Sequence, residues 1–415
     1  MKTKEERPLT KYSAMTPLWI GLFVDILGFY IVIPFLPTFI EVFKTTPFII
    51  GLILATNAVF TLVFAPIWGK ISDKIGRKPV LLISQGGTFT AFILLAFSNS
   101  IEMLFFARMI DGIFGGNFPM VKAIISDAIP PKDRGLQMTN IGVVHVLAGL
   151  VGPALGGFLS IVQPLGPNYP IAAAGFGAAG LSFLSIMITT FFVMETWPKE
   201  DRIAAQKEIK IKLKLRKNKD AMYLMTQYAF HTFSFTMYVT TLTIYIGIVL
   251  GLDTIGISIL LTISGISRAI IRFSVFSLTI KKLGEKRSTE LGLLILVITF
   301  FLIGFVQNIV IFAIFMIVVS YGVSISRGLL ISKITQTVSP KEMGKINGYT
   351  TTLDSLAQIF GPIVGTFILT VYQPFWLGIL MSVLALVAFL MIFHKITPYY
   401  AKEHHEKLDQ VPTHL

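Results

Sequence analysis

Long apolar stretches recur through this 415-residue sequence and constrain its fold more than any other feature. A helix needs about 20 mainly apolar residues to cross the hydrocarbon layer of a bilayer. Stretches close to that length lie at 15–40, 47–69, 79–98, 101–127, 137–161, 170–193, 222–249, 255–280, 289–306, 309–336, 346–371 and 375–394. We therefore predict an all-α integral membrane protein with twelve transmembrane helices, and we interpret the first stretch as a retained helix and not a cleaved signal.

Composition supports a chain that lipid solvates. Hydrophobic residues make up 54% of the sequence and charged residues 14%, against about a quarter charged in soluble domains. Cys is absent, which excludes disulfides and thiol nucleophiles, and the six His show no metal-ligand spacing. The sequence also lacks the G-x-x-x-x-G-K-[ST] loop of nucleotide-driven pumps. We expect no cofactor, no metal ion and no enzymatic activity.

Basic residues concentrate in alternate connections between the predicted spans. Those after spans two and eight are Lys70, Lys74, Arg77, Lys78, Lys281, Lys282, Lys286 and Arg287. Cytoplasmic loops of membrane proteins carry such an excess of Lys and Arg. The even-numbered connections and both termini are therefore predicted to be cytoplasmic. The net charge of +13 reflects this topology, and we expect no nucleic-acid partner.

An internal repeat divides the chain into two halves. At an offset of about 208 residues, the loop at 72–78 aligns with 280–286, and Gly152-Pro153 aligns with Gly361-Pro362. We predict an N-terminal six-helix bundle at 1–194, a basic cytoplasmic linker at 195–220, a C-terminal six-helix bundle at 221–394 and a cytoplasmic tail at 395–415. Two repeated bundles can rock about a site between them, which is the requirement of alternating access.

Four short motifs carry a family resemblance over essentially the whole chain. They are GKISDKIGRK at 69–78, LG followed after five residues by PFLP in span one, RMIDG at 108–112 and GPALGG at 152–157. Together they resemble the major facilitator superfamily, and within it the twelve-span drug/proton antiporters of the tetracycline-resistance and multidrug type. The resemblance implies two pseudo-symmetric bundles and proton-coupled efflux.

The resemblance also implies roles for two motifs. The first loop would latch the outward-facing state, with Arg77 positioned to pair with an acid such as Asp127; the predicted latch residues are Gly69, Asp73, Gly76, Arg77, Lys78 and Asp127. The antiporter motif of span five would comprise Gly149, Gly152, Pro153, Gly156 and Gly157. That motif expects Gly where Ala148 stands, which is a departure from the exporter pattern. A packing face rich in small residues is the alternative interpretation.

Ionisable residues inside predicted spans are candidates for proton coupling, because a charge within the membrane costs several kcal/mol. Asp25 shares a helical stripe with Gly21 and Gly28, so it should face the bundle interior. The predicted coupling residues are Asp25, Arg108, Asp111 and His145. The alternatives are that Asp25 and His145 only hydrogen-bond neighbouring helices, and that Arg108 and Asp111 form a structural pair.

These residues predict a secondary exporter of lipophilic or cationic small molecules, driven by protons and acting as a monomer in the cell membrane. Its partners would be the substrate, protons and the lipid bilayer. The predicted substrate cavity includes Phe29, Tyr30, His231, Phe235 and Tyr238. A symporter or facilitator for a sugar or organic acid remains the alternative. Arg327 and Asp354 receive no assigned role; for Asp354, capping, latching and proton transfer all stay open.

Overall fold

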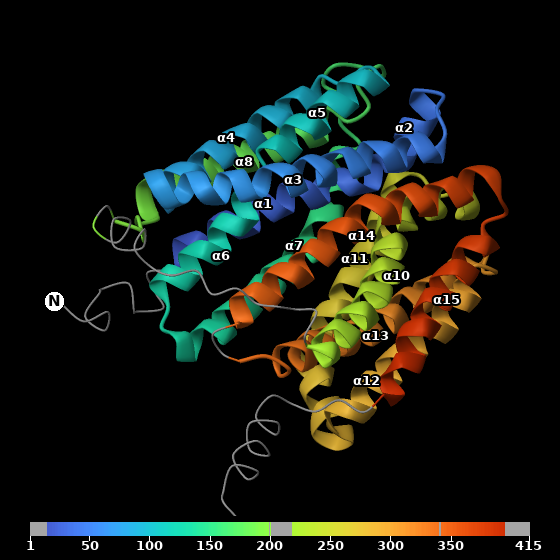
Figure 1. Ribbon diagram of the computed structural model, residues 1–415. Coiled ribbons are helices and arrows are strands. Elements are labelled where there is room, and N and C mark those ends of the chain that lie inside the picture. Colours follow the sequence, from blue (N-terminus) through green and yellow to red (C-terminus); the bar gives the residue numbers. More distant parts are fainter. Residues whose placement is uncertain (1–14, 199, 201–217, 340–341, 395–415) are drawn as a thin grey trace, which may run out of the picture. The chain divides into compact units, whose positions relative to one another are not determined.

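The computed structural model describes residues 15–198, 200, 218–339 and 342–394 (Figure 1). The predicted tail at 395–415 and most of the predicted linker lie outside the described residues. All regular structure within the described ranges is helical, as predicted. The chain divides into two compact units, unit 1 (Met1–Glu208, Thr240–Ala269 and Pro362–Val371) and unit 2 (Ile209–Val239, Ile270–Gly361 and Tyr372–Leu415).

Unit 1 contains most of the helices of the N-terminal half. These are α1 (Thr16–Val32), η4 (Ile33–Phe35), α2 (Leu36–Val42), α3 (Pro47–Ile75), α4 (Arg77–Ala96), α5 (Ile101–Ile113), α6 (Asn117–Ala128), α7 (Pro131–Leu159) and α8 (Ala172–Phe192). Nearly all of α11 (Thr254–Ile270) belongs to the same unit. Helix α1 packs against α7 and α8, and α4 packs against α8. The core of unit 1 therefore lies around α1.

Unit 2 is built from η6 (Ile271–Val275), α12 (Phe276–Ile303), α13 (Ile309–Thr335), α15 (Phe375–Leu390) and η7 (Met391–Phe393). Helices α10 (Lys219–Leu250) and α14 (Met343–Val371) contribute residues to both units. Helix α12 packs against α13 and α15. Leu293, Leu330 and Ile346, from three of these helices, are fully buried in the core of unit 2.

Local sequence sets several helix starts. Pro47 and Pro131 open α3 and α7 at positions where the missing backbone N–H costs no hydrogen bond. The Ser100 hydroxyl caps α5 by accepting from the backbone N–H of Met103, and Asn308 caps α13 by accepting from Val310 and Ile311. These caps satisfy backbone donors that no helical carbonyl can reach.

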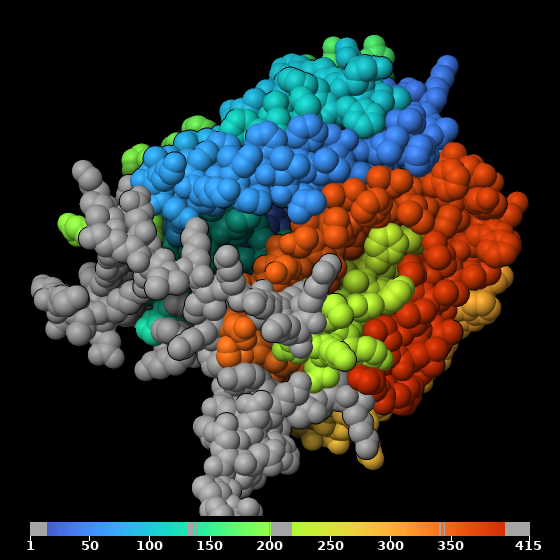
Figure 2. Space-filling model, viewed as in Figure 1, coloured from blue at the N-terminus to red at the C-terminus, as the bar shows by residue number. Residues whose placement is uncertain are grey.

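Ten helices within the described residues are long and apolar enough to cross a membrane. One of them, 254–303, covers the predicted spans eight and nine. The predicted connection between these spans is helical except at Gly284, whose φ of 73° ends one helical segment and begins another. Helix α3 lies at the surface of unit 1, and its side chains Val59, Val63 and Ile67 are exposed (Figure 2).

The predicted span at 101–127 is wrong as one continuous helix, because α5 and α6 are separated by a turn at Phe114, Gly115 and Gly116. The backbone N–H of Gly115 donates to the carbonyl of Gly112 at 3.1 Å, which tightens the last turn of α5. A side chain at Gly116 would collide with the Ser84 hydroxyl. A side chain at Gly115 would likewise collide with Thr61, so the two glycines allow neighbouring helices to pack closely against the break.

Candidate functional site

Asp25 is the centre of a polar cluster in unit 1. It lies ten residues into α1, about 14 Å from the start of that helix. Its Oδ2 accepts hydrogen bonds from Gln85 Nε2 of α4 and Asn117 Nδ2 of α6, each at 3.3 Å. Its Oδ1 is buried and has no hydrogen-bond partner within the described residues. The carboxyl group thus faces the bundle interior, as predicted, and contacts neutral amides.

Ser185 of α8 completes what we call the Asp25 cluster (Asp25, Gln85, Asn117 and Ser185). Gln85 Nε2 also donates to Ser185 Oγ at 2.8 Å, and Ser185 donates to the carbonyl of Gly21 at 3.0 Å. The carbonyl oxygens of the Gln85 and Asn117 side chains are buried without a partner in the described chain. The cluster therefore joins four helices and holds three unsatisfied acceptor atoms. A proton on Asp25 would turn one of these atoms into a donor.

The sequence prediction missed Gln85, Asn117 and Ser185. Their signal was present, because polar side chains inside apolar spans usually hydrogen-bond between helices. It was not specific, since the spans contain many Ser, Thr, Asn and Gln residues. Only the folded bundle shows which of them reach Asp25.

Arg108 and Asp111 form an ion pair on α5, with Arg108 NH1 3.2 Å from Asp111 Oδ2. Asn57 of α3 donates to the same carboxylate oxygen at 2.8 Å. The three-residue spacing on one helix made this pair one of the alternatives in the sequence analysis. The side chain of Arg108 is only 7% exposed. The NH2 group of Arg108 is buried without a hydrogen-bond partner in the described structure. No hydrogen bond or ion pair of the described residues links Arg108 to Asp25.

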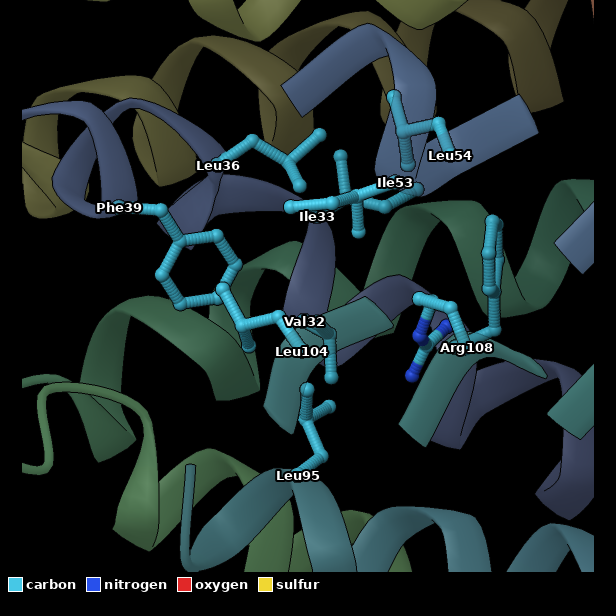
Figure 3. A pocket seen from close by; sticks show the side chains of 10 residues that line it. Val32, Ile33, Leu36, Phe39, Ile53, Leu54, Leu95, Leu104 and Arg108 are labelled. Atoms are coloured by element: carbon cyan, nitrogen blue, oxygen red, sulfur yellow. The ribbon is translucent and has the colours of Figure 1, made fainter. Parts of the chain in front are cut away.

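Arg108 also lines a small apolar pocket in unit 1 (Figure 3). The pocket volume is about 30 Å³, far below the roughly 300 Å³ at which ligand pockets begin. Phe29, a predicted cavity residue, is among its lining side chains together with Val32, Ile33, Leu36, Phe39, Ile53, Leu54, Leu95 and Leu104. A pocket of this size does not hold a drug-sized molecule.

The latch prediction included an ion pair between Arg77 and Asp127, and the structure contains it. Arg77 Nε lies 2.8 Å from Asp127 Oδ2, and Arg77 NH1 lies 2.7 Å from Asp73 Oδ1. Gly76 has a φ of 112°, which only glycine adopts without strain, and it separates α3 from α4. Lys78 Nζ donates to the carbonyl of Thr190, while Gly69 has open space around it. The arrangement joins the ends of α3, α4 and α6.

Glu195 and Trp197 extend this cluster around Arg77 and were missed by the sequence prediction. Glu195 Oε1 accepts from the backbone N–H of Arg77 at 3.0 Å, and Oε2 accepts from that of Lys78 at 3.1 Å. A carboxylate at a helix start also complements the positive end of the helix dipole. The Arg77 guanidinium lies 5.1 Å from the centre of the Trp197 ring, within cation–π range. The beginning of the predicted linker is therefore attached to the start of α4.

The glycines of the antiporter motif lie where α7 meets α1. A side chain at Gly152 would collide with Tyr30, and one at Gly156 would collide with the carbonyl oxygen of Ile31. Pro153 lies inside the helix. Gly149 faces the ring of Tyr30, a predicted cavity residue, and Gly157 faces Ser258 of α11 within the same unit. The motif thus serves close backbone packing of α1 and α7.

His145 of α7 lies against the ring of Phe118 on α6, with centroids 5.5 Å apart in an edge-on arrangement. Its side chain is half-buried in unit 1. Neither an ion pair nor a hydrogen bond between His145 and Asp25 is found within the described residues.

Unit 2 contains a second polar cluster, which we call the Asp354 cluster (Tyr228, Thr232, Arg327 and Asp354). Asp354 Oδ1 accepts from Tyr228 OH at 2.8 Å, Thr232 Oγ1 at 3.0 Å and Arg327 NH2 at 3.1 Å. These donors come from α10 and α13, whereas Asp354 lies on α14. The sequence prediction left both charged residues without a role and missed the two hydroxyl groups.

The remaining predicted cavity residues lie on α10 in unit 2. His231 is 1% exposed, and neither of its ring nitrogens has a hydrogen-bond partner among the described residues. Tyr238 is buried and packs on the ring of Phe300, with centroids 5.3 Å apart. Phe235 is half-buried. Their predicted role as substrate contacts stays a prediction.

Comparison with known proteins agrees with this architecture. The chain is 26% identical over 396 residues to the class H tetracycline resistance protein of Pasteurella multocida, covering 91% of this chain and 93% of that protein. It is 24% identical to multidrug resistance protein 2 of Bacillus subtilis (strain 168), and the match covers 86% of this chain and 89% of that protein. A crystal structure of a D-xylose–proton symporter shares the fold, with a TM-score of 0.75 and 14% sequence identity. The match covers 94% of this chain and 99% of the symporter chain.

The family profile described as Major Facilitator Superfamily matches residues 18–353 and 224–413. These matches agree with the helical architecture and the ten membrane-crossing helices of the described residues. The chain is therefore a multi-pass membrane transporter that belongs to the Major Facilitator Superfamily.

Proposed function

We propose that this transporter exports lipophilic or cationic small molecules from the cell and that an inward movement of protons drives the export. It would act by alternating access, as a monomer in the cell membrane, with both termini in the cytoplasm and without covalent chemistry. The names of its relatives, tetracycline resistance and multidrug resistance proteins, support the substrate class. The distribution of Lys and Arg supports the orientation.

The observation that carries the proposal is the environment of Asp25. A carboxyl group inside a membrane protein must be neutralised by a cation or by a proton. The hydrogen-bond donors to Asp25 are the neutral amides of Gln85 and Asn117, so protonation is the remaining route. A protonated Oδ1 could donate to one of the unsatisfied amide oxygens. Asp25 is thus suited to take up and release a proton in alternate conformations.

The Arg77 latch supplies the conformational part of the proposal. In the proposed orientation the ends of α3, α4 and α6 lie at the cytoplasmic surface. Arg77 binds Asp73 and Asp127 there, and Glu195 holds the start of α4. A cluster of charge-assisted hydrogen bonds that forms in one state and opens in the other can favour one conformation.

The decisive experiment is efflux of a fluorescent lipophilic cation from proteoliposomes that contain purified protein, with an imposed pH gradient. We expect gradient-dependent efflux in the wild type that a protonophore abolishes. Asp25→Asn should lose this efflux and still insert and fold. Asp253→Asn is the matched control, because Asp253 only caps the exposed start of α11, and it should transport like the wild type.

Two outcomes would contradict the proposal. Full gradient-driven efflux by Asp25→Asn would exclude Asp25 as the proton carrier. A gradient that drives uptake of a sugar or organic acid, without efflux of the cation, would indicate the symporter alternative. Folding of each variant is checked by its thermal unfolding in detergent.

A further inference from the structure

Arg327 has hydrogen-bonding capacity that unit 2 does not use. A guanidinium group carries five N–H donors in a planar fork. Arg327 NH2 donates to Asp354 Oδ1 at 3.1 Å, and the guanidinium group also hydrogen-bonds with Tyr228. Its charge is compensated by Asp354, whereas most of its fork is available to another acceptor.

Asp354 is held in place independently of Arg327. Tyr228 and Thr232 both donate to Asp354 Oδ1, the oxygen that also accepts from Arg327. Oδ2 makes no hydrogen bond within the described chain. The pair therefore presents a free carboxylate oxygen beside a largely free guanidinium fork.

The pair is accessible, and its surroundings are polar. The side chains of Arg327 and Asp354 are 38% and 25% exposed. Helix α14 is the least apolar of the ten candidate spans. Thr351 and Gln358 lie three and four residues from Asp354 along the helix and share its face. Charged side chains within membrane spans face protein or water-filled space and not lipid, so this face is suited to a hydrated ligand site.

His231 gives an independent indication of a ligand. It precedes Thr232 on α10 and lies one helical turn after Tyr228, so it belongs to the same part of unit 2. It is 1% exposed, and both ring nitrogens lack a hydrogen-bond partner in the described structure. Buried polar groups without partners are uncommon in folded proteins and indicate a missing ligand or water.

We propose that Arg327, Asp354 and His231 form a substrate subsite in unit 2 that selects lipophilic zwitterions. The Arg327 fork would bind a carboxylate of the substrate through two parallel hydrogen bonds, as guanidinium groups commonly do. The free Oδ2 of Asp354 would contact the cationic group of the same molecule. A substrate with both charges leaves the subsite neutral, whereas a simple cation leaves the Arg327 fork unused. The inference rests on the proposed export function and narrows its substrate class.

The test uses two fluorescent probes that differ in one group: a rhodamine with a free carboxylate, which is a zwitterion, and its ethyl ester, which is a cation. Binding to the purified full-length protein is measured by fluorescence anisotropy without any pH gradient. We expect the wild type to bind the zwitterion about tenfold more tightly than the ester, the effect of one charge-assisted contact.

Three variants make the test specific. The double variant Arg327→Gln/Asp354→Asn removes both charges together and should bind the two probes equally. Arg327→Lys keeps the charge without the fork and should lose most of the preference. Arg272→Gln is the matched control: Arg272 lies over the ring of Phe276 in unit 2, and its loss should leave the preference intact.

Equal binding of the two rhodamines by the wild type would overturn the inference. So would a preference for the zwitterion that persists in the folded double variant. These results are separate from a failure of the proposed function, because the ester can still be tested for gradient-driven efflux. Efflux of the ester without preferential binding of the zwitterion would leave the exporter proposal in place and remove the subsite.

Discussion

Asp25 in unit 1 and Asp354 in unit 2 are both acids inside membrane helices, but they differ in how their charge is compensated. Along their own helices they lie about 14 Å and about 17 Å from the starts of α1 and α14. Asp25 accepts from the neutral amides of Gln85 and Asn117. Asp354 accepts from a guanidinium and two hydroxyl groups.

The difference shows that the function of an acid inside a membrane helix depends on which groups donate hydrogen bonds to it. An acid surrounded by amides is neutral only when a proton is bound, so its state follows the proton supply. An acid paired with Arg is neutral without a proton, so it is suited to structure and recognition. Four predictions test this contrast, in order of decreasing effect.

The largest effect is expected from removing the negative charge of the Arg327–Asp354 pair in unit 2. Asp354→Asn keeps an acceptor for Tyr228 and Thr232 but leaves Arg327 without a counter-charge. We expect a loss of about 2 kcal/mol in the free energy of unfolding, less than for a fully buried pair because Arg327 is partly exposed. Denaturant titration in detergent measures it. The double variant with Arg327→Gln should recover at least half of the loss, and an unchanged stability of Asp354→Asn would contradict the pairing.

A cation placed beside Asp25 should compensate the charge of this acid as Arg327 compensates that of Asp354. Gln85→Lys lengthens the side chain by one atom and offers a positive charge to the carboxylate, which then no longer needs a proton. We expect gradient-driven efflux to fall about tenfold, equivalent to about 1.4 kcal/mol. Gln85→Met, of similar size and without charge, is the control and should lose less activity. Equal transport by the two variants would show that Asp25 is insensitive to a nearby cation.

Removing a single donor from Asp354 should have a smaller effect. Tyr228→Phe deletes one of the three hydrogen bonds to Oδ1, and we expect a loss of about 1 kcal/mol in the free energy of unfolding. Tyr349→Phe serves as the control, because Tyr349 is exposed. If both variants were equally stable, the Tyr228 hydroxyl would contribute nothing to the cluster.

The smallest effect on stability is expected at Asp25. Asn in this position keeps an oxygen for Gln85 and Asn117 and adds an amide that can donate to their unsatisfied carbonyls. We expect the free energy of unfolding of Asp25→Asn to stay within about 0.5 kcal/mol of the wild type, although transport is lost. A loss as large as that of Asp354→Asn would indicate that Asp25 has a charged partner.

The sequence was sufficient for features that depend on local spacing. Asp25 shares a stripe with Gly21 and Gly28, which predicted its inward orientation, and the three-residue separation of Arg108 and Asp111 allowed their ion pair. The latch motif implied the contact between Arg77 and Asp127 through the family resemblance. These features need only helix geometry or a motif that is read continuously along the chain.

Features that depend on helices packing together were not predicted. Gln85 and Asn117 reach Asp25 from sequence distances of 60 and 92 residues, and no periodicity connects them. The same holds for the contact of Tyr228 with Asp354. Glu195 was assigned to the linker because it begins the basic interruption between the two halves, whereas its carboxylate binds two backbone N–H groups of α4. In each case the partner is determined by the fold.

The break between α5 and α6 has a consequence for timing. Asn117, which donates to Asp25, is the first residue after the break, and Trp68 Nε1 binds the carbonyl of Ile113 at 2.6 Å just before it. A break in a helix lets one segment tilt while the other stays in place. Helix movements of this kind take microseconds to milliseconds. In the proposed mechanism, Asn117 would therefore link the protonation of Asp25 to a tilt of α6, and this tilt would be the slow step of turnover.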